Sequence, residues 1–232
     1  MTGAAEGAKG VTGGPRLGPL APASLRETAY RSLCDAFNTG QFAPGDTLTL
    51  QTLADQLGIS LTPVREAVRR LVAEGALIDT PSRTLIVPKF DRQRMADLKS
   101  ARLALETLVL DRAMARATAE WIDALEATLH APDAAGRTGP DLRQNHAFHF
   151  TLYRQADSQV LLPMVQALWL QYGTYLHLIM KHPQVARIAD HRFHHAIIEA
   201  LRRGDRDGAR AALAQDIERS FRVLAPDPDT PA

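Results

Sequence analysis

The sequence is poor in cysteine and in long apolar runs, and it lacks a glycine-rich loop of the kind that cradles phosphates. Its single cysteine, Cys34, cannot form a disulfide within the chain, which indicates a reducing compartment. A membrane-spanning helix needs about 18–20 apolar residues, and the best candidate, residues 160–170, contains Pro163 and Gln166. The N-terminus also lacks the compact hydrophobic segment of a secretory signal. We therefore expect a cytoplasmic protein with no membrane association.

The chain also lacks the net positive charge that draws a whole protein to nucleic acid. Its 27 Lys and Arg residues are nearly balanced by 26 Asp and Glu residues, which leaves a formal net charge of +1. Arginine supplies nearly all of the positive charge, and its guanidinium suits bidentate contacts to phosphate or carboxylate. Any affinity for DNA must therefore come from a local arrangement of charge.

What the sequence does contain is a helix-turn-helix pattern over residues 51–75. Two short helical segments are separated by Gly58-Ile59-Ser60. The second segment has apolar residues at the spacing of one helix face: Val64, Ala67, Val68, Leu71 and Val72. Its opposite face carries three arginines: Arg65, Arg69 and Arg70. We expect Arg70 to point outward or to pair with Glu66 at the i, i+4 spacing. This pattern is typical of a DNA-reading helix, although ordinary helical cores also contain it.

A helix before this pattern and two strands after it complete a winged helix-turn-helix. Ser24 can cap a helix that runs to about Asn38. Residues 76–78 and 84–87 read as short strands, and the turn-forming residues 79–83 between them predict a β-hairpin. Strands at this place are hard to explain in a generic helical bundle, so they favour DNA binding.

From Asp91 onward the character changes, and no further strand pattern appears. Helices are predicted over residues 92–118, 119–130, 140–156, 159–180, 185–203 and 205–224, with a loop at 131–139. Leu98, Leu105 and Leu108 are expected to point inward from the first of these helices. The predicted fold class is mainly α, with an N-terminal winged helix-turn-helix and a C-terminal all-helical bundle. The predicted limits are a disordered arm at 1–23, a winged domain at 24–90, a helical domain at 91–224 and a disordered tail at 225–232.

These residues resemble two regions known from bacterial transcription regulators. The N-terminal domain is similar to the GntR family in Leu53-Ala54, Leu57-Gly58-Ile59-Ser60 and Thr62-Pro63-Val64-Arg65-Glu66-Ala67. The C-terminal domain resembles the FCD domain, the all-helical ligand-sensing domain of the FadR-like subfamily, in Arg102, Glu106, Phe148-His149, Leu152, His194, Ile197-Ile198-Glu199-Ala200 and Gly204-Asp205. The resemblance implies a homodimer that binds a double-stranded DNA operator under the control of a small effector.

The resemblance also implies which residues contact DNA. The candidates are Gln51, Ser60, Leu61, Thr62, Arg65, Arg69 and Arg83. Thr62 and Arg65 match positions that touch DNA in relatives, whereas Leu61 and Gln51 stand where arginines are common. An arginine that binds guanine in a bidentate manner contributes about 1–3 kcal/mol of discrimination. Leu61 offers only apolar contact, for example to a thymine methyl group, so we expect an operator that departs from the usual family half-site.

A second polar cluster falls on apolar helix faces of the C-terminal domain. Asn145 and His149 are four residues apart and project from one face. His194 and Asp216 lie among apolar neighbours on two later helices. One such pair plus one ligand from each of two other helices is how bundles build interior metal sites. Imidazole and carboxylate suit Zn²⁺, Ni²⁺, Mn²⁺ or Fe²⁺, so the sequence predicts a divalent metal held by these four residues.

The resemblance both sharpens and qualifies the metal prediction. Metal-binding FCD domains usually have Asp, His, His and His at these positions, whereas this chain has Asn145 at the first and Asp216 at the last. Two imidazoles and one carboxylate remain, with lower affinity or a different metal preference expected. The alternative is that these groups bond to one another, or to an organic ligand, without a metal. His191, three residues before His194, is the expected substitute if one of the four is not a ligand.

Arg102 matches a position that lines the effector pocket in relatives. If it points inward, its guanidinium beside a metal would clamp a carboxylate, so the expected effector is a small organic acid. The alternative is a surface pair with Glu106 at the i, i+4 spacing. Two other classes of protein remain: a metal-dependent enzyme of helical-bundle type, for which no general base or oxyanion donor is apparent, and a helical adaptor without DNA binding.

Overall fold

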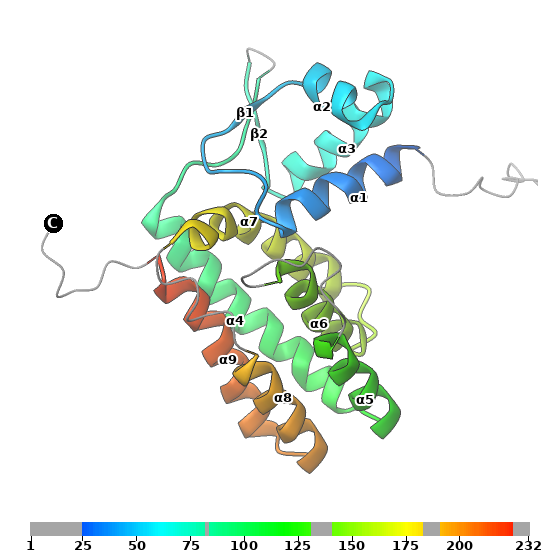
Figure 1. Ribbon diagram of the computed structural model, residues 1–232, viewed down its shortest axis with the longest axis vertical. Helices are drawn as coiled ribbons and strands as arrows, with labels where there is room; N and C mark the ends of the chain where they lie inside the picture. Colours follow the sequence, from blue (N-terminus) through cyan, green and yellow to red (C-terminus); the bar gives the residue numbers. More distant parts are fainter. Residues whose placement is uncertain (1–24, 82–83, 131–140, 183–190, 225–232) are drawn as a thin grey trace, which may run out of the picture.

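The computed structural model describes residues 25–81, 84–130, 141–182 and 191–224. The fold is mainly α, which confirms the predicted fold class. The predicted N-terminal arm, C-terminal tail and loop at 131–139 lie outside the described residues. Figure 1 shows the winged domain at one end of the longest axis of the molecule and the helical domain along the rest of it.

The described part of the winged domain combines helices with a small sheet. Its elements are α1 (Leu25–Asn38), β1 (Thr47–Leu48), α2 (Leu50–Leu57), α3 (Leu61–Ala73), β2 (Ile78–Asp79) and β3 (Leu85–Ile86). The strands are antiparallel in the order β1-β3-β2, with Ile86 opposite both Thr47 and Ile78. The predicted hairpin is therefore present. The sequence missed β1 because a strand of two residues has no alternating pattern.

Local capping determines where α2 begins and ends. Thr49 caps its N-terminus, because the hydroxyl oxygen accepts a hydrogen bond from the Thr52 backbone N–H at 3.0 Å. Gly58 adopts a left-handed φ of 65°, which is favourable for glycine and ends the helix. Pro63 is the third residue of α3, where its missing N–H breaks no helical hydrogen bond. The two helices are thus separated by a short turn, and α3 buries one face in the core of the domain and exposes the other.

The helical domain contains longer helices that agree in place with the prediction. Its elements are α4 (Arg92–Met114), α5 (Ala119–Ala127), the 3-10 helix η1 (Thr128–His130), α6 (Leu142–Arg154), α7 (Leu161–Lys181), α8 (Arg192–Arg203) and α9 (Arg206–Arg222). The helix α4 ends earlier than predicted because Thr118 is the N-cap of α5 and accepts a hydrogen bond from the Trp121 N–H at 3.2 Å. The expectation that Leu108 points inward was wrong, since this side chain is 41% exposed.

The helix α7 joins the two domains. Trp169 belongs to the hydrophobic core of the helical domain, whereas Leu170 belongs to the core of the winged domain. At Gly173 the backbones of α7 and α1 approach so closely that a Cβ would lie 2.3 Å from the Phe37 carbonyl oxygen. The predicted limit between the domains near residue 90 stays a prediction. Among the helices of the described residues, none is long and apolar enough to cross a membrane.

Candidate DNA-binding surface and interior polar site

The predicted DNA-binding residues of α2 and α3 lie on the outside of the winged domain. Those that the structure describes are all exposed: Gln51, Ser60, Leu61, Thr62, Arg65 and Arg69. Arg83 lies outside the described residues. Leu61 is the first residue of α3 and is 37% exposed. Residues at the N-terminal end of the second helix contact base edges in helix-turn-helix proteins, so an apolar side chain stands at a position where it can affect sequence preference.

Two arginines of α3 form ion pairs with acidic residues close to them in the sequence. Arg69 pairs with Glu66 at 2.8 Å, and both side chains are exposed. Arg70 does not pair with Glu66 but with Glu74, at 3.0 Å from Nε to Oε1. Arg70 is exposed, which agrees with the expected outward orientation, and only the alternative partner Glu66 was wrong. Tyr30 of α1 also donates a hydrogen bond to Glu74, at 2.7 Å, and its ring lies beneath the Arg70 guanidinium at 3.6 Å. Arg70 therefore stabilises the contact between α1 and α3.

Arg65 is placed differently from its neighbours. It lines a surface hollow of about 570 Å³ between α3 and the strands, together with Arg69, Asp79 and Leu85. It forms no ion pair with any described residue. Its guanidinium therefore remains available for a phosphate or a base edge, which is the role that the sequence predicted for it.

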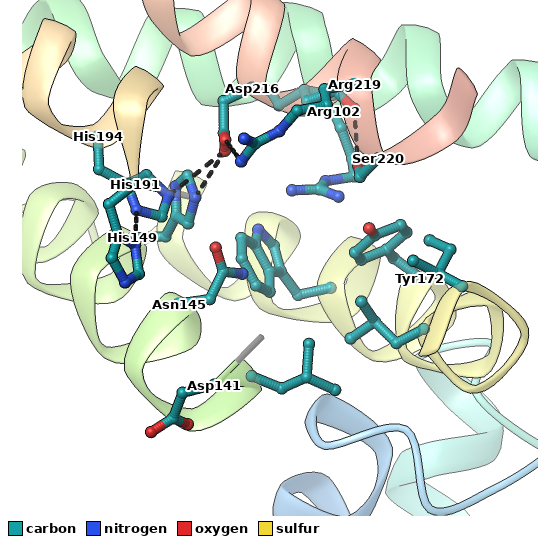
Figure 2. A pocket seen from close by; sticks show the side chains of 15 residues that line it. Arg102, Asp141, Asn145, His149, Tyr172, His191, His194, Asp216, Arg219 and Ser220 are labelled. Atoms are coloured by element: carbon teal, nitrogen blue, oxygen red, sulfur yellow. Dashed lines mark hydrogen bonds and ion pairs between the residues drawn. The ribbon is translucent and has the colours of Figure 1, made fainter. Parts of the chain in front are cut away.

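Three of the four predicted metal ligands meet inside the helical domain. His149 of α6, His194 of α8 and Asp216 of α9 are buried, and one potential ligand atom of each lies within 4.8 Å of the others. The distances to Asp216 Oδ2 are 3.1 Å from His149 Nε2 and 3.6 Å from His194 Nε2. Figure 2 shows these side chains pointing toward one another. Three helices thus bring two imidazoles and one carboxylate to a single point.

The fourth predicted ligand and its expected substitute lie beside this cluster. Asn145 lines the same cavity, one turn before His149 on α6, and is half-buried. His191 does not belong to the three-residue cluster but contacts His194, with 3.0 Å between the two Nδ1 atoms. The cavity volume is about 60 Å³. His191 is thus placed to orient His194, and Asn145 to contact whatever the cavity holds.

Arg102 points into the interior and also pairs with Glu106. The two side chains are 3% and 0% exposed, and Arg102 Nε donates to Glu106 Oε1 at 2.6 Å. The guanidinium lies 4.6 Å from the centroid of Trp169 and 4.3 Å from that of Tyr172. Its Nη1 has no hydrogen-bond partner among the described residues. The alternative of a pair with Glu106 was therefore right about the partner, but the pair is buried and not at the surface. One donor of Arg102 remains unused beside the cavity that this residue lines.

A chain of hydrogen bonds connects this ion pair to the cluster. Tyr153, four residues after His149 on α6, donates its hydroxyl proton to Glu106 Oε2. The Tyr153 oxygen is also 3.0 Å from His149 Nδ1. At the far end, Arg219 Nη2 donates to Asp216 Oδ1 at 2.9 Å. The only signal of these partners in the sequence is their spacing, since Tyr153 and Arg219 follow a predicted ligand by four and three residues on the same helix.

The protons available along this chain are too few for its contacts. Glu106 to Tyr153, Tyr153 to His149 and His149 to Asp216 each need one proton. With both carboxylates ionised, the tyrosine and a neutral imidazole supply two. The third contact requires either a second proton on His149 or a cation beside Asp216. The three contacts therefore lack one proton when His149 is neutral and no cation is bound.

Burial acts on both members of the His149 and Asp216 pair. Burial lowers the pKa of His149, and the bond to Asp216 offsets this only in part. Burial alone would raise the pKa of the Asp216 carboxyl, but the close contacts with His149 and His194 hold that pKa well below its usual range. Asp216 is therefore ionised, and a protonated His149 is disfavoured by its surroundings.

The helices that line the cavity also contact the winged domain. His146, three residues before His149 on α6, is 3.1 Å from Asn38 of α1 through its Nε2. Gln171 of α7 donates to the Glu74 carbonyl oxygen at 3.0 Å. A change in the position of α6 or α7 at the cavity would therefore alter the contacts of these helices with the C-terminal ends of α1 and α3.

A winged helix-turn-helix with an exposed basic helix, joined to a second, helical domain, is the architecture of a DNA-binding transcriptional regulator. Residues 25–85 match the gntR family of bacterial regulatory proteins, and residues 97–219 match the FCD domain. The chain therefore belongs to the GntR family of transcriptional regulators, among those with an FCD domain. This membership confirms the resemblance inferred from the sequence.

Individual relatives support the same assignment. The transcriptional regulator McbR of Escherichia coli is 28% identical over 215 residues, which cover 90% of this chain and 97% of that protein. The structure of Escherichia coli McbR superimposes with a TM-score of 0.78 at 29% identity, covering 87% of this chain and 97% of that one. The Nta operon transcriptional regulator of Aminobacter aminovorans is 33% identical over 129 residues, covering 55% of this chain and 61% of that protein. These relatives are transcriptional regulators, which agrees with the prediction that the chain is not an enzyme.

Proposed function

We propose that this regulator binds its operator as a homodimer in the cytoplasm, and that a small carboxylate bound in the helical domain controls its affinity for DNA. The exposed side chains of α3 support the first part. Arg65 has an unpaired guanidinium beside the hollow next to the strands, and Thr62 and Leu61 lie at the exposed N-terminal end of α3. We assign base and phosphate contacts to these residues and to Gln51, Ser60, Arg69 and Arg83.

We also propose that His149, His194 and Asp216 hold a divalent metal, with the Asn145 side-chain carbonyl as a further contact. The observation that carries this proposal is that one potential ligand atom from each of these three buried side chains lies within 4.8 Å of the others. A cation there would also satisfy both the Nε2 lone pair of His149 and the carboxylate of Asp216. Two imidazoles and one carboxylate suit Zn²⁺, Ni²⁺, Mn²⁺ or Fe²⁺. Such an ion supplies a positive charge that attracts an acidic ligand.

The effector class follows from the free donors around the cavity. Arg102 Nη1 and Trp169 Nε1 are buried and have no hydrogen-bond partner among the described residues. Both residues line the cavity, and two such donors match the oxygens of a carboxylate. A volume of about 60 Å³ holds roughly four water molecules, so the ligand that fits without rearrangement is an acid of few heavy atoms.

The metal proposal is tested by thermal unfolding with Zn²⁺, Ni²⁺ and Mn²⁺ after chelation. At one hundred times its dissociation constant a bound ion stabilises the folded state by about 2.7 kcal/mol, so we expect a clear rise in melting temperature for the wild type. Asp216→Asn should abolish the rise, whereas Asp123→Asn, at an exposed aspartate of α5, should leave it intact. No rise with any ion would contradict the metal and favour direct hydrogen bonding within the cluster.

The DNA and effector proposals are tested together with DNA from the promoter region of the protein's own gene. Binding should be salt-dependent, and Arg65→Ala should weaken it about tenfold or more. Arg112→Ala, at an exposed arginine of α4, serves as the control and should bind as the wild type does. Screening small organic, sugar and amino acids should reveal one that changes this affinity and loses its effect in Asp216→Asn. If no acid shifts binding or stability, the effector proposal is wrong, and absent DNA binding would favour a helical adaptor.

A further inference from the structure

The hydroxyl of Tyr153 occupies an unusual place between a buried carboxylate and a buried imidazole. Tyr153 is 1% exposed, Glu106 0% and His149 1%. Glu106 accepts two hydrogen bonds from Arg102, at 2.6 and 3.2 Å, and a third from Tyr153. A carboxylate in this environment acts only as an acceptor. The single hydroxyl proton of Tyr153 is therefore directed to Glu106, and its oxygen is left to accept.

We propose that Glu106 and Tyr153 are positioning residues that keep a proton on Nδ1 of His149 and so direct the lone pair of its Nε2 toward the metal. This inference rests on the proposed metal function. The geometry that carries it is the 3.0 Å contact from His149 Nδ1 to the Tyr153 oxygen, with Nε2 facing Asp216 on the opposite side of the ring. A partner on the second ring nitrogen of a metal-binding histidine fixes its tautomer and raises its basicity.

The same chain reaches the proposed effector site. Arg102 uses Nε and Nη2 to hold Glu106 and keeps Nη1 unused beside the cavity that it lines. An acid bound at Nη1 would therefore touch the first member of a chain whose last member is a metal ligand. His194 has a different support, because its Nδ1 meets the neutral ring of His191 rather than a tyrosine held by a carboxylate. The two histidines of the site are thus held by chemically distinct partners.

The first test uses the wild-type protein with ¹⁵N-labelled histidine and nuclear magnetic resonance, which distinguishes the two ring nitrogens. The His149 signals are assigned by their loss in His149→Gln. We expect Nδ1 of His149 to carry a proton both in the metal-free protein and in the protein loaded with Zn²⁺. A His149 with no proton on Nδ1 in the metal-free wild type would overturn the proposal without any variant having to fold.

The second test removes only the hydroxyl group, in Tyr153→Phe. Without its acceptor, the metal-free variant should shift to the tautomer that carries its proton on Nε2 and donates it to Asp216. The dissociation constant for Zn²⁺, measured by competition with a chelator, should rise about 10–100-fold. Tyr175→Phe is the matched control, because Tyr175 is equally buried in the same domain but does not line the cavity. Its zinc affinity and His149 tautomer should be those of the wild type.

The outcomes separate this proposal from the one on which it rests. An unchanged tautomer or an unchanged zinc affinity in Tyr153→Phe overturns the positioning role. If wild-type protein binds no Zn²⁺ at all, the metal proposal fails, and the comparison of tautomers alone decides whether Tyr153 controls His149.

Discussion

The two domains place their charged side chains in opposite ways. In the winged domain the arginines of α3 lie on the surface, and those with partners pair with other exposed or half-exposed groups. In the helical domain Arg102, Glu106 and Asp216 are buried and held in a continuous chain with His149 and Tyr153. The described charged groups of α3 are thus open to solvent, whereas those of the helical domain are enclosed among its helices.

This difference determines what each domain can tolerate. Exposed ion pairs contribute little to stability, so the surface of α3 can change and alter sequence preference while the fold persists. A buried charge requires its partner, because removing one leaves the other desolvated and uncompensated. We therefore expect substitutions in the helical domain to affect stability and binding together, and those on α3 to affect DNA binding alone.

The largest effect is expected from Glu106→Ala. This change leaves the buried guanidinium of Arg102 without its carboxylate, which should lower the free energy of unfolding by about 3–5 kcal/mol. Chemical denaturation followed by circular dichroism measures it. The matched control is Glu66→Ala, which breaks the exposed pair with Arg69 and should lower stability by less than about 1 kcal/mol. Similar losses in the two variants would remove the contrast between the domains.

The sequence predicted much of this arrangement, but for reasons that differ between the domains. The helix faces and the placement of His149, His194 and Asp216 on inward faces follow from periodicity, which a single sequence displays. The partner of Arg70 could not be read in the same way, because Glu74 is fixed there by Tyr30 of another helix.

The chain from Arg102 to Asp216 was likewise hidden in the sequence. It is built from three helices, and only its local steps, such as His149 to Tyr153, have a spacing that sequence displays. Whether Arg102 points in or out depends on packing against Trp169 and Tyr172, which no pattern within α4 encodes. The spacing within one helix therefore indicated which pairs could form, whereas packing between helices decided which of them do form.

The next effect concerns sequence preference on the exposed side. Leu61→Arg places a guanidinium at the N-terminal end of α3, where it can bind guanine, so discrimination at one position of each half-site should change by about 1–3 kcal/mol. Selection of binding sites from a random DNA library measures this. Leu61→Met keeps an apolar side chain and should retain the wild-type preference. If Leu61→Arg also retains it, Leu61 does not face the bases.

A smaller effect is expected at the joint between the domains. Gly173→Ala adds a Cβ that would lie 2.3 Å from the Phe37 carbonyl oxygen, so α1 and α7 must separate. Overpacking of this kind typically costs about 1–3 kcal/mol, and the better helix propensity of alanine returns about 1 kcal/mol. Melting temperature should fall modestly, and Met164→Ala, at an exposed position of the same helix, should change it less. If the melting temperature of Gly173→Ala equals that of the wild type, the two domains can shift at this contact without loss of stability.

The smallest effect on stability is expected from Arg69→Ala. Arg69 is exposed and bonded only to Glu66 among the described residues, so its removal should change the free energy of unfolding by less than about 0.5 kcal/mol. If Arg69 contacts a phosphate, DNA binding should weaken evenly across operator sequences, and the slope of log affinity against log salt should become shallower by about 1. A sequence-dependent loss would instead assign Arg69 to base reading. In both cases the substitution changes DNA binding and not stability, because the partner of Arg69 among the described residues, Glu66, is itself exposed.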